Sequence, residues 1–227
     1  GELVDIFNVN RRIVRTIHEG VDSDFAEGTK HEPPEGTPEK YLLFVSTLEP
    51  RTIVAGVLSA FRLMVEWGYQ GDLVLVGRWG WRTGKIRHEL ENSPVRERIH
   101  HLDYVERSHL GALYGRADAL LFPSWVEGFG LPLVESMACG TPVVTSGTSA
   151  MPEIAGPAAV YLDPESPHNI ASATVALLGD AQHQQRLVEL GRERVKKFSW
   201  ESTAAATATV LRHAAGLPTD AEEEYRA

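Results

Sequence analysis

Short apolar runs alternate with amphipathic stretches along most of this chain. The runs are rich in Val, Leu and Phe, which is typical of strands that are buried on both faces. They lie at residues 41–45, 73–76, 119–122, 142–145 and 158–162, with a weaker run at 99–102. Apolar residues at helical spacing predict helices at 52–67, 83–91, 110–114, 131–139, 167–178, 180–197 and 199–213.

Strands that alternate with helices predict parallel crossovers, and therefore an α/β fold with a Rossmann-like, doubly wound parallel sheet. Sheets of this kind bind ligands at the carboxyl ends of their strands. We therefore expect the turns after residues 45, 76, 122 and 145 to share one rim.

The two ends of the chain do not follow this alternation. Residues 1–26 read as a helix face, which includes Leu3, followed by a short strand at 12–17. Residues 27–40 carry prolines and a glycine among charged residues, which is the composition of a linker. The predicted division is an N-terminal remnant at 1–26, a linker at 27–40, the α/β domain at 41–198, a terminal helix at 199–215 and a polar tail at 216–227.

Composition narrows the possible classes. The formal net charge of −9 argues against general nucleic-acid binding, which requires a basic surface. No apolar run approaches the roughly 20 residues that span a bilayer. Cys139 is the single cysteine, which excludes an internal disulfide and favours a reducing, cytoplasmic setting. Its small neighbours favour buried packing over a nucleophilic role.

Residues 127–144 carry the most informative chemical pattern. Seven residues separate Glu127 from Glu135, Gly128 and Gly130 leave the backbone bare between them, and Pro132 stands where a helix would begin. A helix N-terminus offers free N–H groups and a positive dipole end, which suits an anion. The alternatives are an ordinary strand–turn–helix with Pro at its first position and, for Glu135 in the first turn, plain stabilisation by the helix dipole.

This window belongs to an ordered set of short motifs. The others are residues 48–51 (LEPR), 73–77 (LVLVG), 80–81 (GW), 122–124 (FPS) and 198–201 (FSWE). Together they resemble the C-terminal domain of a retaining glycosyltransferase of family 4, with the GT-B fold, over residues 3–213. In that family two Rossmann-like domains face each other across a cleft, and the C-terminal one binds the nucleotide-sugar donor.

The resemblance implies that the N-terminal, acceptor-binding domain is not part of this chain. Residues 1–26 resemble the end of that domain, and residues 199–213 resemble the helix that crosses back to pack on it. We therefore expect a donor-binding half that either is cut from a longer protein or works with a separate partner.

The resemblance also assigns roles to single residues. It places Glu127 on the donor hexose, as the catalytic candidate, and Glu135 on the ribose hydroxyls. It places the diphosphate against the backbone around the helix start, at Gly128, Phe129, Gly130, Leu131, Pro132 and Leu133. Val105 would contact the nucleobase, and Gly77 would either admit the ligand or simply end a strand. Neither carboxylate needs to be a covalent nucleophile, because same-face attack assisted by the leaving phosphate explains retention in this family.

One part of the chain departs from the family pattern. Many relatives carry an Arg and, five residues later, a Lys after the first strand, and both contact the diphosphate. Here those positions are Thr47 and Thr52. Arg51 and Arg78 lie on the same predicted rim, so either can supply the missing charge, and our hypothesis is that Arg51 contacts the phosphate. For each, the alternative is a solvated or salt-bridged surface arginine.

The expected function is the donor-binding part of a hexosyltransferase in polysaccharide biosynthesis. It would take a GDP- or UDP-sugar as substrate, need no cofactor and no metal, and be inactive by itself. The acceptor would be a glycan, a lipid or a small molecule, and work at the inner face of the membrane stays open. A non-catalytic nucleotide-sugar-binding module is the main alternative, favoured by Thr52 and the missing domain. A sugar-nucleotide epimerase on the same fold is a third, against which the Glu-x7-Glu window argues.

Overall fold

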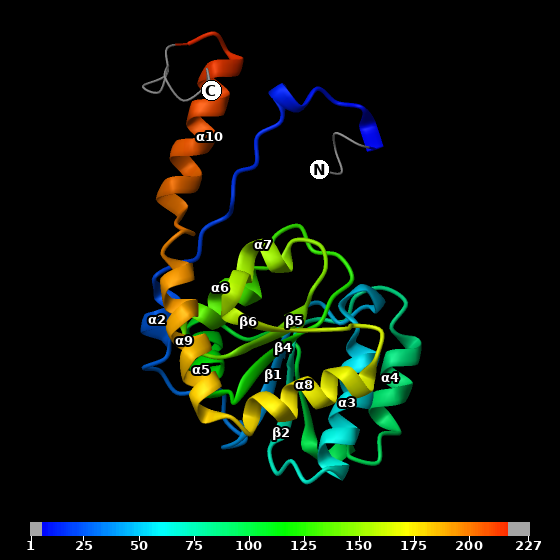
Figure 1. The fold of residues 1–227 in the computed structure, drawn as a ribbon. Coiled ribbons are helices and arrows are strands. Elements are labelled where there is room, and N and C mark those ends of the chain that lie inside the picture. The colour runs from blue at the N-terminus through cyan, green and yellow to red at the C-terminus, as the bar shows by residue number, and fades with distance from the viewer. Residues whose placement is uncertain (1–5, 218–227) are drawn as a thin grey trace. The chain divides into compact units, whose positions relative to one another are not determined.

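The computed structural model describes residues 6–217, which form parts of two compact units (Figure 1). One unit is Val21–Lys197, and the other combines Gly1–Gly20 with Phe198–Ala227. The predicted positions of Leu3 and of tail residues 218–227 lie outside the described residues.

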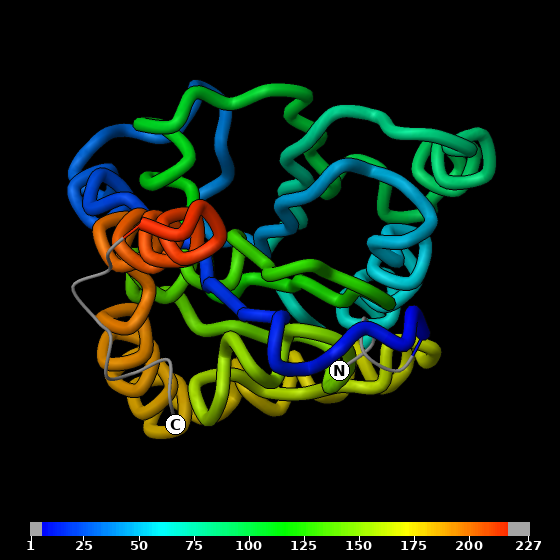
Figure 2. Tube along the Cα trace, turned by 90° about the horizontal axis from the view of Figure 1, so that it is seen from above, coloured from blue at the N-terminus to red at the C-terminus, as the bar shows by residue number. Residues whose placement is uncertain are grey.

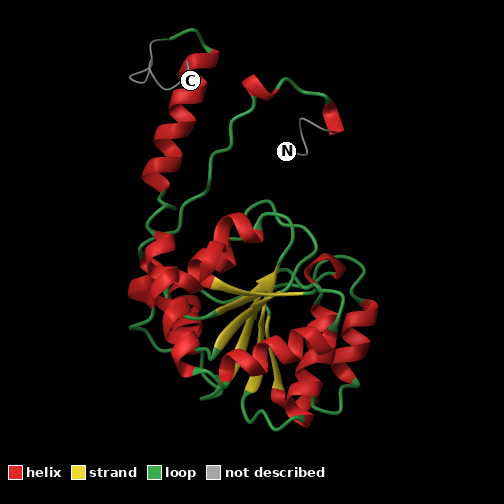
Figure 3. Cartoon of the chain, viewed as in Figure 1, coloured by secondary structure: helices red, strands yellow, loops and turns green. Residues whose placement is uncertain are grey.

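A parallel sheet forms the centre of the Val21–Lys197 unit (Figure 3). Its strands are β1 (Tyr41–Val45), β2 (Asp72–Val76), β3 (Ile99–Leu102), β4 (Ala119–Phe122), β5 (Val143–Ser146) and β6 (Ala159–Leu162). In the described part of the chain the sheet has six strands in the order β3-β2-β1-β4-β5-β6, and all neighbours run parallel. This is the doubly wound order of a Rossmann fold, and it confirms the predicted fold class.

Helices cover both faces of the sheet (Figures 1 and 2). On one face α3 (Val54–Glu66) packs against α4 (Gly84–Glu91) and α8 (Pro167–Leu178). On the other face lie α2 (Asp24–Gly28), α5 (Arg107–Arg116), α6 (Leu131–Ala138) and α9 (Ala181–Val195), with α7 (Met151–Ala155) against α6. With both faces covered, Leu42, Leu43 and Phe44 of β1 are fully buried.

The compact unit begins earlier than residue 41. Phe25 in α2 is buried and packs edge-to-face on Tyr114 of α5, with 6.0 Å between ring centroids. Gly28 and Gly111 let the same two helices approach closely, because a Cβ at Gly111 would lie 2.8 Å from the Gly28 Cα. Residues 21–40 therefore pack as part of the α/β unit, although a linking role for 27–40 in a longer protein stays a prediction.

The sequence pattern did not predict two short helices, and one predicted strand is wrong. Neither α2 nor α7 spans two helical turns, so neither shows a readable period. The strand expected at 12–17 is replaced by a 3₁₀ turn, η1 (Arg11–Ile13), which Asn10 caps through its side chain. Its apolar residues suit a strand, but no described strand pairs with this segment.

The smaller unit contains α10 (Trp200–Ala214). Ser199 caps this helix by accepting a hydrogen bond from the Ser202 amide. Thr203 donates to the His18 carbonyl at 2.7 Å, and His18 packs edge-to-face on Phe198. Across the described residues, no helix combines the length and apolar character that crossing a bilayer requires.

The loops after β1 and β2 stay paired beyond the ends of their strands. Leu48 N–H donates to Arg78 O at 2.9 Å, and Gly80 N–H donates to Leu48 O at 3.0 Å. At the start of this extension Gly77 has φ +144°, and a Cβ there would lie 1.9 Å from Ser46 O. The close approach of the two backbones is therefore sufficient to require glycine at position 77, whether or not a ligand binds there.

We predict that Gly77→Ala destabilises the chain more than Gly68→Ala does. Both glycines have positive φ, which disfavours Ala by roughly 1–3 kcal/mol, but a Cβ at Gly68 would meet nothing within 4 Å. The free energies of unfolding in urea measure both losses. Equal losses would show that the Ser46 contact contributes nothing.

Candidate functional site

Three loops meet at the carboxyl end of the sheet, as the strand order requires. They follow β1, β4 and β5, the strands around the point where the strand order reverses. Trp125 N–H donates to Arg51 O at 3.2 Å, and Ser124 N–H donates to Ser146 Oγ at 3.0 Å. The predicted common rim is therefore formed by these loops, and the loop after β2 joins it through Leu48 and Arg78.

Glu127 lies on the loop after β4, and one of its carboxylate oxygens is held twice. Oε1 accepts from Arg51 Nη1 at 2.5 Å and from Ser124 Oγ at 2.8 Å. Ser124 itself is fully buried. Oε2 has no hydrogen-bond donor among the described residues, so it can accept a hydrogen bond from a ligand.

Ser149, on the loop after β5, fixes the backbone of Glu127. Its Oγ accepts from Glu127 N–H at 3.2 Å and donates to Glu127 O at 3.0 Å. Ser149 has φ +54°, in the left-handed region that non-glycine residues seldom adopt. In the sequence, the one signal for this residue is a run of small, mostly polar residues at the end of a strand.

Arg51 is salt-bridged, which was the alternative to its predicted contact with a phosphate. Nε donates to Glu49 Oε1 at 2.9 Å, while Nη1 donates to Glu127 Oε1 and to Val126 O. Partial burial alone would lower the pKa of Arg51, but Glu49 and Glu127 together raise that pKa above its ordinary value. Nη2 is the one guanidinium nitrogen of Arg51 without a partner among the described residues, so a phosphate contact by Arg51 would have to use Nη2.

Thr52 does not face a ligand. It is 1% exposed, and its hydroxyl lies 2.9 Å from both Thr47 O and Glu49 O, which closes the 3₁₀ turn η2 (Pro50–Thr52). The structure therefore argues against the predicted donor contact and gives Thr52 a structural role. Ile53, which follows it, has φ +53°, a strained conformation for a β-branched residue.

The remaining candidates on this side of the rim are more open. Thr47 is exposed beside Gly80, where a Cβ would lie 2.8 Å from Thr47 Cγ2. Arg78 is exposed too, and its guanidinium lies 5.6 Å from the ring centroid of Tyr104. That contact joins the loops after β2 and β3 next to half-buried Val105. Arg78 is therefore better placed than Arg51 to meet an anion.

The start of α6 supplies unengaged backbone donors. Gly130 is its N-cap with φ +104°, Leu133 N–H already bonds to Gly130 O at 2.9 Å, and Pro132 has no N–H. The amides of Gly128, Gly130 and Leu131 donate to no described residue. The predicted backbone site for the diphosphate therefore reduces to these three amides, which we call the amide site.

The residues around the amide site differ in their exposure to solvent. The side chains of Phe129 and Leu133 are buried and pack in the core, so neither is available to a ligand. A Cβ at Gly128 would meet nothing within 4 Å, so the space beside this backbone is empty. Leu131, at the first position of α6, is exposed.

Glu135 lies in the second turn of α6, so its expected place in the first turn is wrong. Tyr114, which is fully buried in α5, donates to Glu135 Oε2 at 2.9 Å. Burial raises the pKa of Glu135, while the bond from Tyr114 and the charge of Arg107 oppose that shift. Glu135 Oε1 has no donor among the described residues and can accept from a ligand hydroxyl.

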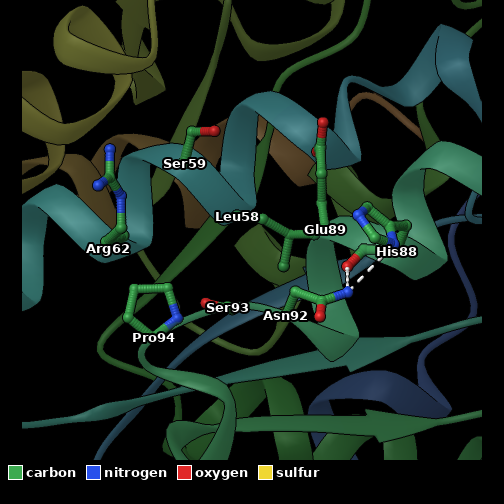
Figure 4. Close-up of a pocket in the computed structure, with 8 residues that line it drawn as sticks. All are labelled: Leu58, Ser59, Arg62, His88, Glu89, Asn92, Ser93 and Pro94. Atoms are coloured by element: carbon green, nitrogen blue, oxygen red, sulfur yellow. Dashed lines mark hydrogen bonds between the residues drawn. The ribbon is translucent and has the colours of Figure 1, made fainter.

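Other groups contribute no chemistry to this rim. Burial raises the pKa of Cys139 to about 12, so its thiol packs and does not act as a nucleophile. Within the described ranges, no three His, Cys, Asp or Glu side chains gather closely enough to hold a metal ion. A pocket of about 370 Å³ lies between α3 and α4 (Figure 4), but none of the predicted site residues lines it.

We predict that Glu135→Gln stabilises the chain more at pH 7 than at pH 4. Because the pKa of Glu135 is raised in the folded state, the folded chain binds this proton more tightly than the unfolded chain. Ionised Glu135 therefore lowers stability as the pH rises from the ordinary carboxyl pKa through the raised value. Gln keeps an acceptor for Tyr114 but never ionises.

Urea unfolding from pH 4 to pH 8 measures this difference, with Glu91→Gln as the control at an exposed glutamate. The same pH dependence in both variants would contradict the effect of burial at Glu135.

Two curated proteins are similar to the chain over most of its length. O-antigen chain mannosyltransferase B of Escherichia coli is 31% identical over 216 residues, which are 91% of this chain and 56% of that protein. MMP alpha-(1->4)-mannosyltransferase of Mycolicibacterium hassiacum is 31% identical over 219 residues, which are 94% of this chain and 51% of that protein. The chain therefore spans about half the length of the curated relatives it matches.

Solved structures show the same fold. Sucrose-phosphate synthase from Thermosynechococcus elongatus matches with a TM-score of 0.72 and 26% identity, over 89% of this chain and 53% of that one. A glycosyltransferase from Rickettsia africae matches with a TM-score of 0.78 over 93% of this chain and 60% of that one, and at 16% identity this likeness concerns the fold alone. These matches agree with the predicted half of a GT-B fold.

A family model described as glycosyl transferases group 1 matches residues 27–194. The chain therefore belongs to the group 1 glycosyl transferases.

Proposed function

We propose that this chain binds the donor in a retaining glycosyltransferase that moves a hexose from a nucleoside-diphosphate sugar. One observation carries the proposal. Three unengaged amides, at Gly128, Gly130 and Leu131, lie between Glu127 and Glu135, and each carboxylate has one engaged and one available oxygen. Backbone donors at a helix start suit a diphosphate, and available carboxylate oxygens suit sugar hydroxyls.

The roles follow from where charge develops in the reaction. As the nucleotide leaves, negative charge grows on its phosphate oxygens, where the free amides and the N-terminus of α6 stabilise it. Exposed Arg78 supplies the positive charge that relatives place at the position of Thr52. Glu127 Oε2 accepts from a hexose hydroxyl, and Glu135 Oε1 accepts from a ribose hydroxyl. No step assigned to these residues requires a metal or an organic cofactor.

The names of the relatives narrow the choice of sugar. Two of them are mannosyltransferases, and one of those is named for the O-antigen chain. We therefore propose mannose as the donor sugar and a growing glycan as the acceptor, with a role of the whole enzyme in polysaccharide biosynthesis. The acceptor-binding half would come from the rest of the protein or from a separate chain, so this chain alone would be inactive.

A non-catalytic module is the second candidate. The buried Thr52 favours it, because this loop holds no cation of its own other than Arg51, which is salt-bridged. Donor hydrolysis by the chain together with its acceptor-binding half supports the enzyme. Tight binding without turnover in the same system supports the module.

A thermal-shift panel tests the binding function directly. GDP, UDP and ADP, each alone and as its mannose and glucose conjugates, are titrated into the chain. A ligand that binds only the folded state raises the melting temperature with its concentration. We expect one base to be preferred and its mannose conjugate to shift the melting temperature furthest. No shift with any of them at millimolar concentration would refute the proposal.

We further predict that Gly128→Ala weakens diphosphate binding by about tenfold, roughly 1.4 kcal/mol, without changing stability by more than about 0.5 kcal/mol. The new methyl group fits the folded chain, because nothing lies within 4 Å, but it would occupy the space that the diphosphate needs. Gly84→Ala is the matched control, because that position is equally open and lies on α4.

Calorimetric titration of the nucleoside diphosphate measures both variants. Unchanged affinity in Gly128→Ala would exclude the diphosphate from this place.

A further inference from the structure

Glu127 is held by side chains that come from three separate loops. Arg51 belongs to the loop after β1, Ser124 to the loop after β4, and Ser149 to the loop after β5. Arg51 and Ser124 occupy Oε1, while Ser149 fixes the peptide groups on both sides of the Glu127 Cα. A surface glutamate normally samples many rotamers, so this number of bonds removes most of its freedom.

Glu49 holds Arg51 in turn. Its carboxylate is almost buried, accepts from Arg51 Nε at 2.9 Å and also caps the 3₁₀ turn that ends at Thr52. The planar guanidinium therefore has one edge on Glu49 and its Nη1 on Glu127 and Val126. Because Arg51 is shared by two carboxylates, the group of three keeps a net negative charge.

This charge balance favours one of two roles for Arg51. As a phosphate ligand through Nη2, Arg51 would be shared among two carboxylates and an anionic diphosphate, so the group would carry a larger net negative charge. As a holder of Glu127 it keeps both carboxylates paired and directs the remaining oxygen. The second role agrees with every contact that Arg51 makes among the described residues.

We propose that Glu49, Arg51 and Ser149 are positioning residues that set the direction of Glu127 Oε2 toward the donor sugar. This inference rests on the proposed function. Since Oε1 already accepts two bonds, only Oε2 is left for the hexose, and its fixed direction selects which hydroxyl geometry it can meet. The three residues then contribute to recognition of the sugar and contribute nothing to binding of the nucleotide.

The test separates the sugar from the nucleotide by two affinities. Titration calorimetry gives Kd for GDP and for GDP-mannose, or for the preferred base and its hexose, and their ratio is the sugar increment. In Glu49→Gln, Arg51→Met and Ser149→Ala we expect the increment to fall about fivefold or more, while Kd for the nucleoside diphosphate changes less than twofold. Glu49→Gln keeps an acceptor for the turn, and Arg51→Lys, which keeps a cation beside Glu127, should recover part of the increment.

Two controls make the result specific to Glu127. Arg62→Met, at an exposed arginine of α3 that pairs with Glu66, should leave both affinities unchanged. In a Glu127→Ala background, Arg51→Met should cause no further loss of the increment, because it acts through the missing carboxylate.

The outcomes are distinguishable. If Arg51→Met weakens the nucleoside diphosphate as much as its sugar, Arg51 contacts the diphosphate and the inference is overturned. An increment that stays unchanged in all three variants overturns it as well, as does a wild-type chain that binds nucleotide and sugar nucleotide equally. If the wild-type chain binds no nucleotide at all, the proposed function itself is refuted.

Discussion

The parallel pairing of β1 with β4 is the contact on which the site depends. Leu42 lies opposite Ala119 and Leu43 opposite Leu120, although the two strands are far apart in the sequence. This pairing brings the ends of both strands to the same edge of the sheet, so the loop that carries Arg51 meets the loop that carries Glu127. The pairing of β4 with β5 brings Ser149 to Glu127, and the pairing of β1 with β2 brings Leu48 to Arg78.

Several hydrogen-bonding groups of the site have no partner within the described part of the chain. Glu127 and Glu135 each have one oxygen bonded within the chain and one available, and the amides at the start of α6 donate to no described residue. Such groups normally bond within the fold or to water, because burying them unpaired is unfavourable. Burial raises the pKa of Glu135, so its ionised form lowers the stability of the folded chain.

The loop after β1 is built around Thr52, the residue that departs from the expected family pattern. At the position where the resemblance leads one to expect a lysine, Thr52 is buried, and its hydroxyl bonds to the carbonyl oxygens of Thr47 and Glu49. Ile53 then takes a left-handed conformation at the start of α3, and Arg51 turns toward two carboxylates. Under the proposed function, the positive charge for a diphosphate would therefore come from the N-terminus of α6 and from Arg78.

The sequence by itself determined the α/β fold, the approximate extent of its strands and longer helices, and the Glu-x7-Glu window at a helix start. These depend on local periodicity and on short motifs, which neighbouring residues encode. Only the tertiary structure decided that Arg51 pairs with Glu49 and Glu127, that Ser149 holds the Glu127 backbone, that Tyr114 binds Glu135 and that α2 packs with the α/β unit. Except for the local bond to Glu49, those contacts join residues far apart in the chain. They depend on strand order and on side-chain direction, which no local pattern specifies.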